Sequence, residues 1–376
     1  MPKGSASHPA SAVGGPSPSA ETGRQRGLWD GYRVGFGEAV LRTALTPPAA
    51  RYDLHVAFIM EGLFAVKEGI ESALGDLVRQ VTVLPPDASA IERIRELRPD
   101  LVLVLNGIHA FGADLSRELK TLGVQTAIWF VDDPYYSDDS GRIAPFYDHV
   151  FTHEMSTIPF YTDRGVTRLH YLPLAASPRV FRPQRVGPAY HSDVCFIGTG
   201  FWNRIAFFDE LIPLIPGKRL VLIGGLWDRL RHFPKVAAFA RLAGVGIEES
   251  ALYYSGASLV LNMHRAPEDA AHNRNTQGLP AYSVNPRTFE IAACGAMQLT
   301  DVRQDLDSFF TPGSEIETYR SSAELADKIT YYLQQEEQRQ RVARGALYRS
   351  RGYTYRNRLQ QMLITIYPEL SRFEYT

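Results

Sequence analysis

The segment AYSVNPRTFEIAACGAMQLTD, residues 281–301, predicts a loop, a short helix and a strand in succession. Asn285 suits the N-cap of the helix, and Pro286 suits its first position, where the missing N–H costs nothing. Cys294 and Gly295 end the helix before the apolar strand. The first turn of such a helix presents free backbone N–H groups and the positive end of the helix dipole, which favour an anion.

Two charged side chains make this helix a candidate nucleotide site. Arg287 stands in its first turn, and Glu290 lies one turn further on. A cation beside a helix N-terminus suits phosphate, and a carboxylate one turn away suits ribose hydroxyls. The alternative is an ordinary capped helix with a surface arginine and glutamate, and the spacing alone does not decide between the two.

Length and composition indicate an ordinary globular protein of two domains, because 376 residues exceed most single cores. Hydrophobic residues make up 45% of the chain and charged residues 22%. A formal net charge of -1 argues against an electrostatic nucleic-acid binder. Cys195 and Cys294 lie in apolar surroundings and predict buried thiols in a reducing compartment. No apolar run has transmembrane length and no signal segment is evident, so we expect a cytoplasmic protein.

Apolar strands that alternate with helices predict an α/β fold with parallel sheets covered on both faces. Residues 1–27 are rich in Ser, Ala, Gly and Pro and are expected to be disordered. One α/β unit is expected over 28–178 and a second over 193–350, with a proline-rich linker at 179–192. A C-terminal helix is expected over 351–376, in a position to pack back on the first unit.

Ligands of parallel sheets bind beyond the carboxyl ends of the strands. In the first unit these ends carry a polar set of seven residues: Glu61, Asn106, His109, Asp132, Asp133, His153 and Glu154. Paired carboxylates raise one another's pKa, so Asp132 or Asp133 could position an acceptor hydroxyl or act as a base. The alternative is a capping role in the turn that follows. His109, His153 and His264 are too scattered for a metal motif, and each alone is more often a hydrogen-bonded core or rim residue.

The second unit offers a glycine turn after its first strand. Gly198 and Gly200 could let the backbone approach a diphosphate, with Arg204 adding positive charge. The full GxGxxG pattern and an acidic residue for a dinucleotide ribose are missing, so a dehydrogenase is disfavoured and a tight turn is the alternative. Seven arginines between residues 339 and 358 could contact a membrane or a lipid-linked acceptor. Neighbouring glutamates and glutamines favour a solvated helix face instead.

Several segments together carry a resemblance to a known family: residues 193–198 with Arg204, 261–265, 285–296, 301–306, 310–316, 354–358, 129–134 and 171–175. They resemble the group 1 glycosyltransferases of the GT-B fold, and most closely the CgeB-like (spore maturation protein) branch. The resemblance implies two Rossmann-like domains that face a cleft, with an activated sugar nucleotide held mainly by the C-terminal domain.

The resemblance also implies a donor site. Glu290 would bind the ribose, while Arg204, Arg287 and the N–H groups near Thr288 would neutralise the diphosphate, so that no metal is needed. The complete predicted donor set is Gly198, Gly200, Arg204, Gly224, Asn262, His264, Arg287, Thr288 and Glu290, and the predicted acceptor side is Glu61, Asn106, His109 and His153. Many group 1 enzymes carry a second glutamate eight positions before the ribose-binding one. Here that position is Tyr282, so the loop 270–283 is the other candidate for the sugar contacts.

The function predicted is sugar transfer from a nucleotide diphosphate sugar, with UDP as the first choice of nucleotide, to a hydroxyl of a glycan, lipid or protein. No cofactor and no nucleic-acid partner are expected, and peripheral membrane contact stays open. One alternative is a GT-B-fold sugar-nucleotide epimerase, which needs no acceptor. The other is a catalytically silent paralogue that binds glycan or acts as a scaffold.

Overall fold

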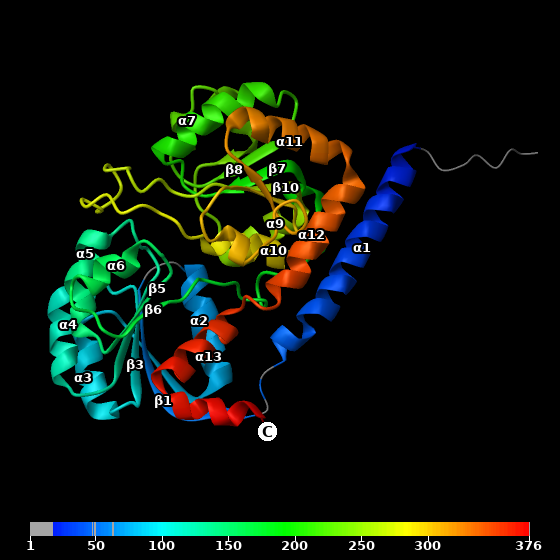
Figure 1. Ribbon diagram of the computed structural model, residues 1–376. Helices are drawn as coiled ribbons and strands as arrows, with labels where there is room; N and C mark the ends of the chain where they lie inside the picture. Colours follow the sequence, from blue (N-terminus) through cyan, green and yellow to red (C-terminus); the bar gives the residue numbers. More distant parts are fainter. Residues whose placement is uncertain (1–17, 47, 49, 62–63, 376) are drawn as a thin grey trace, which may run out of the picture.

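Two six-stranded parallel sheets, each covered by helices, form the body of the molecule (Figure 1). The computed structural model describes residues 18–46, 48, 50–61 and 64–375. In the first sheet the strand order is β2-β1-β3-β4-β5-β6, and in the second it is β12-β11-β10-β7-β8-β9. The predicted α/β class with two Rossmann-like domains is confirmed.

The first sheet is built from strands that are apolar on both faces. All five residues of β3, LVLVL, are buried, as expected for a strand between two helical layers. The strands are β1 (Tyr52–Met60), β2 (Val78–Leu84), β3 (Leu101–Leu105), β4 (Thr126–Phe130), β5 (His149–Thr152) and β6 (Leu169–Tyr171). The helices are α2 (Phe64–Leu77), α3 (Ala88–Leu97), α4 (Gly112–Thr121), α5 (Ser137–Ile143) and α6 (Thr157–Thr162).

The second sheet repeats this plan with shorter edge strands. Its strands are β7 (Ser192–Ile197), β8 (Leu220–Ile223), β9 (Ala240–Arg241), β10 (Ala257–Asn262), β11 (Gln298–Asp301) and β12 (Glu317–Tyr319). Its helices are α7 (Trp202–Leu211), α8 (Phe233–Val236), α9 (Ile247–Gly256), α10 (Pro286–Ala293), α11 (Ser322–Gln334) and α12 (Glu336–Ser350). Short 3-10 helices lie at Ala144–Phe146, Pro188–Tyr190, Ile212–Leu214, Trp227–Arg229, Ala237–Phe239 and Leu306–Ser308. Cys195 and Cys294 are buried free thiols of this half.

The end of the chain returns to the first sheet. Helix α13 (Tyr355–Ile366) and a 3-10 segment (Pro368–Tyr375) follow α12, and α13 packs beside α2 (Figure 1). Tyr355 and Leu359 belong to the same buried cluster as the strands of the first sheet. Gly69 makes this approach possible, because a Cβ there would lie 2.3 Å from the Tyr355 ring.

The expected disorder at the N-terminus is wrong for residues 18–27, while residues 1–17 lie outside the described part. Helix α1 runs from Pro18 to Leu45 along the outer side of α12 (Figure 1). It is anchored further along, where Arg33 Nη2 donates a hydrogen bond of 2.6 Å to Ser255 O and Leu41 is buried. Once residues 33–41 are held in a helix, extending that helix by one more residue costs little free energy. The composition of residues 18–27 therefore does not show that they join this helix.

Candidate functional site

A cavity of about 320 Å³ opens at the carboxyl ends of β7 and β8, beside the N-terminus of α10. Val66 of α2 forms part of its wall, so both halves of the chain contribute to it. The lining of the second half includes Gly198, Thr199, Gly224, Gly225, Tyr254, Arg287 and Glu290. Four predicted donor residues therefore meet in one cavity. The position is the one at which ligands of parallel sheets bind.

Glycines let the two strand-end loops pack closely. Gly224 has a φ of +136°, and a Cβ there would lie 2.3 Å from Gly198 O. A Cβ on Gly200 would lie 3.0 Å from Leu226 O. The Trp227 indole N–H donates to Gly198 O at 2.9 Å and fixes the first loop from behind. The glycines are therefore required by the fold of the cavity wall as well as available to a ligand.

Glu290 is the carboxylate of the cavity. Its side chain is 5% exposed, and burial raises its pKa to about 7 although Arg287 acts in the opposite direction. None of the described residues donates a hydrogen bond of standard geometry to this carboxylate. It is thus a desolvated acceptor that a hydroxyl-bearing ligand can satisfy.

Arg204 is a buried cation without a carboxylate partner among the described residues. Its Nε and Nη2 donate to Met263 O at 3.1 and 2.6 Å, and its Nη1 donates to Thr199 O at 2.9 Å. Burial and the nearby Arg287 lower its pKa to about 9. Arg204 and Arg287 therefore place two positive charges beside the cavity and only one carboxylate, Glu290, lines it, which favours an anionic ligand.

The cap of α10 corrects one expectation. Asn285 Oδ1 accepts from Thr288 N at 3.2 Å, and the Thr288 hydroxyl accepts from Asn262 Nδ2 at 3.1 Å. The Thr288 N–H is therefore used by the cap and is not free for a diphosphate. Asn262 and Asn285 also exchange amide hydrogen bonds of 2.9 and 3.1 Å. These residues hold the end of the helix, and Arg287 supplies its positive side chain.

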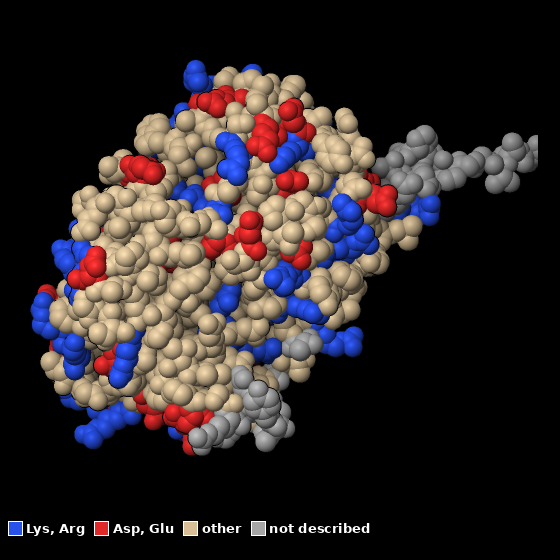
Figure 2. Space-filling view, in the orientation of Figure 1, with Lys and Arg blue, Asp and Glu red and all other residues tan. Residues whose placement is uncertain are grey.

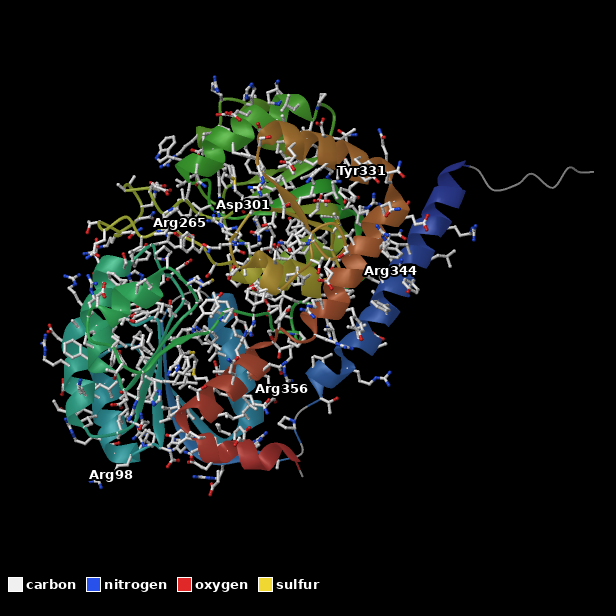
Figure 3. All side chains as sticks on the ribbon, in the orientation of Figure 1. Arg98, Arg265, Asp301, Tyr331, Arg344 and Arg356 are labelled. Atoms are coloured by element: carbon white, nitrogen blue, oxygen red, sulfur yellow. The ribbon has the colours of Figure 1, made fainter. Side chains whose placement is uncertain are left out.

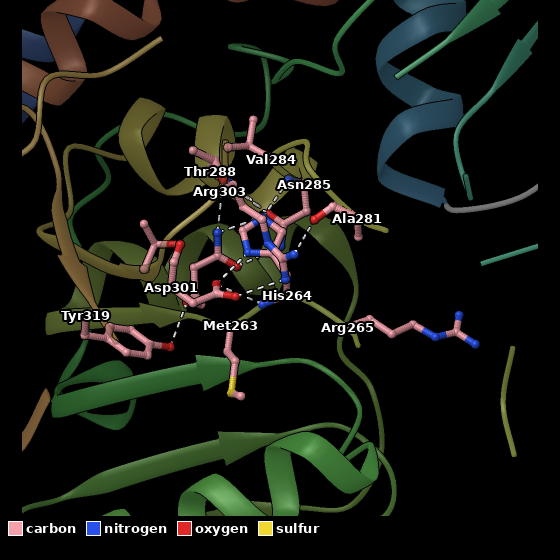
Figure 4. A network of polar contacts seen from close by, with 12 residues as sticks. Met263, His264, Arg265, Ala281, Val284, Asn285, Thr288, Asp301, Arg303 and Tyr319 are labelled. Atoms are coloured by element: carbon pink, nitrogen blue, oxygen red, sulfur yellow. Dashed lines mark hydrogen bonds and ion pairs between the residues drawn. The ribbon is translucent and has the colours of Figure 1, made fainter. Parts of the chain in front are cut away.

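His264 is likewise a support and not a free donor contact (Figure 4). Its Nδ1 lies 2.6 Å from Asp301 Oδ1, and its Nε2 accepts from Asn285 N at 2.9 Å. Burial lowers its pKa to about 4, so the ring is neutral at pH 7. Arg303 donates to Asp301 Oδ2 at 3.1 Å and completes the network. Sequence reasoning gave Asp301 and Arg303 no role, although Asp301 ends a strand and was open to the same argument as the other strand ends.

The two predicted catalytic carboxylates have different environments. Asp133 is buried and accepts from Thr152 Oγ1 at 2.8 Å, from Tyr161 OH at 2.7 Å and from Ser140 Oγ at 3.0 Å. Burial raises its pKa to about 6. Asp133 is therefore an internal support, and the prediction that it faces an acceptor is wrong. Asp132 is half-buried and stays a candidate for the acceptor side.

The acceptor-side residues divide in the same way. Glu61 accepts from the backbone N–H groups of His109, Ala110 and Phe111 at 2.7, 2.8 and 3.0 Å. It therefore shapes the turn that presents His109, whose ring meets the edge of Tyr136 at 5.0 Å. Because its oxygens are occupied in this way, Glu61 is a positioning residue and was wrongly placed among the acceptor contacts.

Asn106 and His153 differ in whether their polar atoms are used. Asn106 is fully buried and donates to Asp132 Oδ2 at 2.8 Å, so it orients that carboxylate. His153 is buried, and its ring interacts with the backbone of Asp133 but makes no hydrogen bond to a side chain of the described residues. Burial lowers its pKa to about 4, with His264 nearby acting in the same direction. His153 is thus a buried, neutral imidazole.

The loop 263–285, here called the bridging loop, joins the second half to the first. The backbone N–H of Arg274 donates to Tyr135 O at 2.7 Å, and that of Asp138 donates to Arg274 O at 3.0 Å. The Asp138 carboxylate accepts from Thr276 Oγ1 at 2.8 Å, and Arg274 Nε lies 3.2 Å from Asp139 Oδ2. These contacts hold the loop against the start of α5.

A second clasp lies at the other end of the bridging loop. The buried carboxylate of Glu154 accepts from Tyr282 N at 3.0 Å and from Ser283 N at 3.1 Å. At the start of the bridging loop, Arg265 points from the second half toward the first (Figures 3 and 4). Its guanidinium lies 4.8 Å from the ring centroid of Tyr135 and 4.7 Å from that of Phe201. Tertiary contacts of this kind carry no local sequence signal.

Comparison with known proteins assigns the family. A family model described as "Glycosyl transferase-like" matches residues 204–364, which contain Arg204, Arg287 and Glu290. The chain is 30% identical over 263 residues to spore protein CgeB of Bacillus subtilis (strain 168), an alignment that covers 69% of this chain and 80% of that protein. The chain belongs to the CgeB-like glycosyltransferase family. This confirms the resemblance found in the sequence.

Solved structures agree with the GT-B fold of this CgeB-like glycosyltransferase. Anabaena Alr3699/HepE, in complex with UDP and glucose, has a TM-score of 0.58 at 11% identity, and the match covers 83% of this chain and 99% of that one. Sucrose-phosphate synthase of Thermosynechococcus elongatus has a TM-score of 0.56 at 13% identity over 85% of this chain and all of the other. At these identities the likeness concerns the fold.

Three further observations describe this CgeB-like chain. Within the described residues, no group of three or more histidine, cysteine or acidic side chains is arranged to hold a metal ion. No helix in the same part of the chain combines the length and apolar character that crossing a bilayer requires. At the Tyr282 position, where many group 1 enzymes have a glutamate, the backbone N–H is already bound by Glu154.

Proposed function

We propose that this glycosyltransferase takes its sugar from a UDP-linked donor bound in the cavity beside α10. The observation that carries the proposal is that Glu290, which accepts no hydrogen bond of standard geometry from a described residue, lines one cavity with Arg287. Arg204 is buried behind the cavity wall, where it donates to Thr199 O. Ribose hydroxyls would satisfy the carboxylate, and a diphosphate would neutralise the two cations. UDP is chosen because Anabaena HepE, of the same fold, was crystallised with UDP and glucose.

The chemistry follows from the place of the charges. Transfer breaks the bond between the sugar and the diphosphate, so negative charge grows on the leaving phosphate oxygen. Arg204 is held in place by three hydrogen bonds before any ligand arrives, so it stabilises that charge without reorganisation. We propose that the two arginines suffice for this task without a metal ion. The incoming hydroxyl belongs to a glycan, a lipid-linked sugar or a protein.

Asp132 is the residue we propose for the acceptor side. Its carboxylate is oriented by Asn106, lies in the field of Arg265 from the opposite half, and is near the His109 turn. Such a group can orient an acceptor hydroxyl or remove its proton. His153 is proposed to contact the substrates, since its ring makes no hydrogen bond to a side chain of the described residues. The buried free thiols suit a reducing compartment, and we place the enzyme in the cytoplasm.

The test is calorimetry and thermal shift with UDP, GDP, ADP, dTDP and CMP, each with magnesium and with EDTA. We expect selective stabilisation by UDP in both conditions, because a bound ligand stabilises the folded state. Glu290→Ala and Arg287→Ala should weaken UDP binding, while Glu337→Gln on the exposed start of α12 should not. Absence of binding by every nucleotide would favour the silent, glycan-binding alternative.

The epimerase alternative predicts a different product. After incubation of the enzyme with UDP-glucose alone, NMR of the sugar nucleotide would reveal a new epimer with no release of UDP. A glycosyltransferase instead releases UDP and does so faster when an acceptor hydroxyl is added. Asp132→Asn should slow that release while UDP affinity stays unchanged, because Asp132 lies on the opposite half from Arg287 and Glu290.

A further inference from the structure

An apolar and basic surface lies on the outer sides of α1 and α12. On α1, Leu28 and Tyr32 are 62% and 48% exposed, and Phe36 is half-buried one turn further along. The Tyr32 ring stacks on Phe36 with centroids 6.0 Å apart. These residues are spaced by four, so they form one outward stripe, while Leu41 faces inward. Helix α1 therefore has a buried apolar face that packs on the protein and a second apolar face that is exposed to solvent.

The neighbouring stripe on α12 and its C-cap residue Arg351 is basic. Arg341, Arg344, Tyr348 and Arg351 follow the spacing of three and four that defines one helix face. Arg344 lies 5.8 Å from the ring centroid of Tyr32 on α1, which joins the two stripes, and Arg351 lies 3.8 Å from that of Tyr348. Figure 2 shows basic groups along the α12 side of the molecule, and Figure 3 shows Arg344 where the two helices meet.

The charge of this surface is not balanced locally. Residues 339–358 contain seven arginines and no acidic residue, although the whole chain has a formal net charge of -1. None of Arg341, Arg344 and Arg351 has a carboxylate partner among the described residues. The two glutamates of α12, Glu336 and Glu337, stand in its first turn, before the stripe begins. The cations are therefore open to an external anionic partner.

We propose that the two stripes together dock the protein on an anionic lipid surface. Their residues are Leu28, Tyr32, Phe36, Arg341, Arg344, Tyr348 and Arg351. Tyrosine suits the boundary between headgroups and acyl chains, because its ring is apolar and its hydroxyl is polar. Arginine carries an apolar stem under a charged head that pairs with lipid phosphate. Exposed aliphatic and aromatic side chains beside a row of cations match a peripheral membrane surface.

A second copy of the chain fits this surface less well. In a two-fold contact the same patch faces itself, so the three arginines of one copy would lie opposite those of the other. Like charges brought together in this way oppose association. A nucleic acid would use the cations but would leave Leu28 without a partner.

The proposal does not depend on the donor site, since α1 and the stripe residues of α12 lie outside the cavity described above.

The experiment is sedimentation of the full chain with vesicles of phosphatidylcholine alone and of phosphatidylcholine mixed with phosphatidylglycerol. We expect binding to the mixed vesicles at low salt, weaker binding at high salt and little binding to the neutral ones. The triple variant R341E/R344E/R351E should lose about 100-fold in partition, since each basic residue contributes about fivefold near such a surface. The matched control R98E/K218E/R229E reverses three exposed charges elsewhere and should bind like the original chain.

The apolar half is tested by L28S/Y32S, which keeps every charge. We expect several-fold weaker binding to the mixed vesicles with unchanged UDP binding and unchanged melting temperature, because both side chains are exposed. Equal binding to both vesicle types, or no loss in the triple variant, overturns the proposal. So does a dimer in light scattering that L28S/Y32S dissociates, or binding of duplex DNA without binding of vesicles.

Discussion

His264 and Asp301 hold the N-terminus of α10 in place, with Nδ1 of the ring 2.6 Å from Oδ1 of the carboxylate. Because Nε2 accepts the N–H of Asn285, the ring carries its proton on Nδ1 and must stay neutral. Burial lowers the pKa of His264 to about 4. The strand end of β11 thereby fixes the helix that presents Arg287 and Glu290.

Replacing His264 by Phe should destabilise the protein and weaken UDP binding. The substitution leaves the buried Asn285 N–H without its acceptor, which costs about 1–3 kcal/mol. It also removes the ring N–H from Asp301, which keeps Arg303 and the backbone N–H of residue 264 as donors. His264→Gln can restore the acceptor for Asn285 and should recover part of the loss. The measurements are urea unfolding and calorimetry with UDP. Equal stability of His264→Phe and the original chain would contradict the role of His264 in holding the N-terminus of α10.

The pH dependence of unfolding tests the same residue. The folded-state pKa of His264 lies near 4 and its ordinary value is 6.5, so the unfolded chain binds the proton more readily. Its contribution to stability is complete above pH 6.5 and is lost as the pH falls toward 4. The original chain should lose more stability over this window than His264→Phe. Identical slopes for the two proteins would contradict the neutral ring.

Glu290 predicts a pH dependence of nucleotide affinity. Its pKa near 7 means that about half of the unliganded protein carries a neutral carboxyl at that pH. The ionised form is the better acceptor for ribose hydroxyls, so UDP affinity should rise between pH 6 and 8. Glu290→Gln should bind more weakly and show a flatter profile, which corrects for titration of UDP itself. Parallel profiles in calorimetry would place the ribose elsewhere.

Much of the fold could be predicted because its signals are local. The run 101–105 is apolar throughout and becomes a fully buried strand, and Asn285 and Pro286 take the N-cap and first position of α10 as expected. The prediction for the first turn of α10 was partly wrong. The residue that predicts a helix N-terminus, Asn285, occupies the Thr288 N–H that was assigned to a diphosphate.

The site could be predicted less well because side-chain direction and distant partners decide it. Successive residues that leave a strand point to opposite sides, so Asp132 and Asp133 could not both face the cleft. The partner of His264 is 37 positions away, and that of Glu154 is 128 positions away. Neither distance leaves a pattern in the sequence. Tertiary contacts therefore separate the residues that support the site from those that line it.

Asp132 and Asp133 should respond to substitution in opposite ways. Asp133→Ala removes the buried acceptor that the hydroxyls of Thr152, Tyr161 and Ser140 share, and should cost roughly 3 kcal/mol of unfolding free energy. Asp132→Asn keeps its shape and should leave stability and UDP affinity nearly unchanged while sugar transfer falls. Urea unfolding and a UDP-release assay measure the two effects. A stable Asp133→Ala protein with lost turnover would reverse the assignment.

The bridging loop should hold the two halves together in the absence of substrate. Asp138→Ala removes the acceptor of Thr276, and the further change Arg274→Ala removes the ion pair with Asp139. Solvent-exposed contacts of this kind contribute about 0.5 kcal/mol each, so the double variant should shift the balance toward an open form by roughly fivefold. The backbone bonds between Arg274 and the start of α5 remain, which limits the effect to the side chains.

Small-angle scattering of the nucleotide-free protein measures this opening as a larger radius of gyration. Asp163→Ala removes an exposed aspartate of the same half that has no part in the loop, and its scattering should match the original chain. Limited proteolysis should also cut the bridging loop faster in the double variant, since its side-chain contacts with α5 are gone. If scattering and cleavage stay unchanged, the clasp at Glu154 holds the domains by itself, and Glu154→Gln then becomes the variant that opens them.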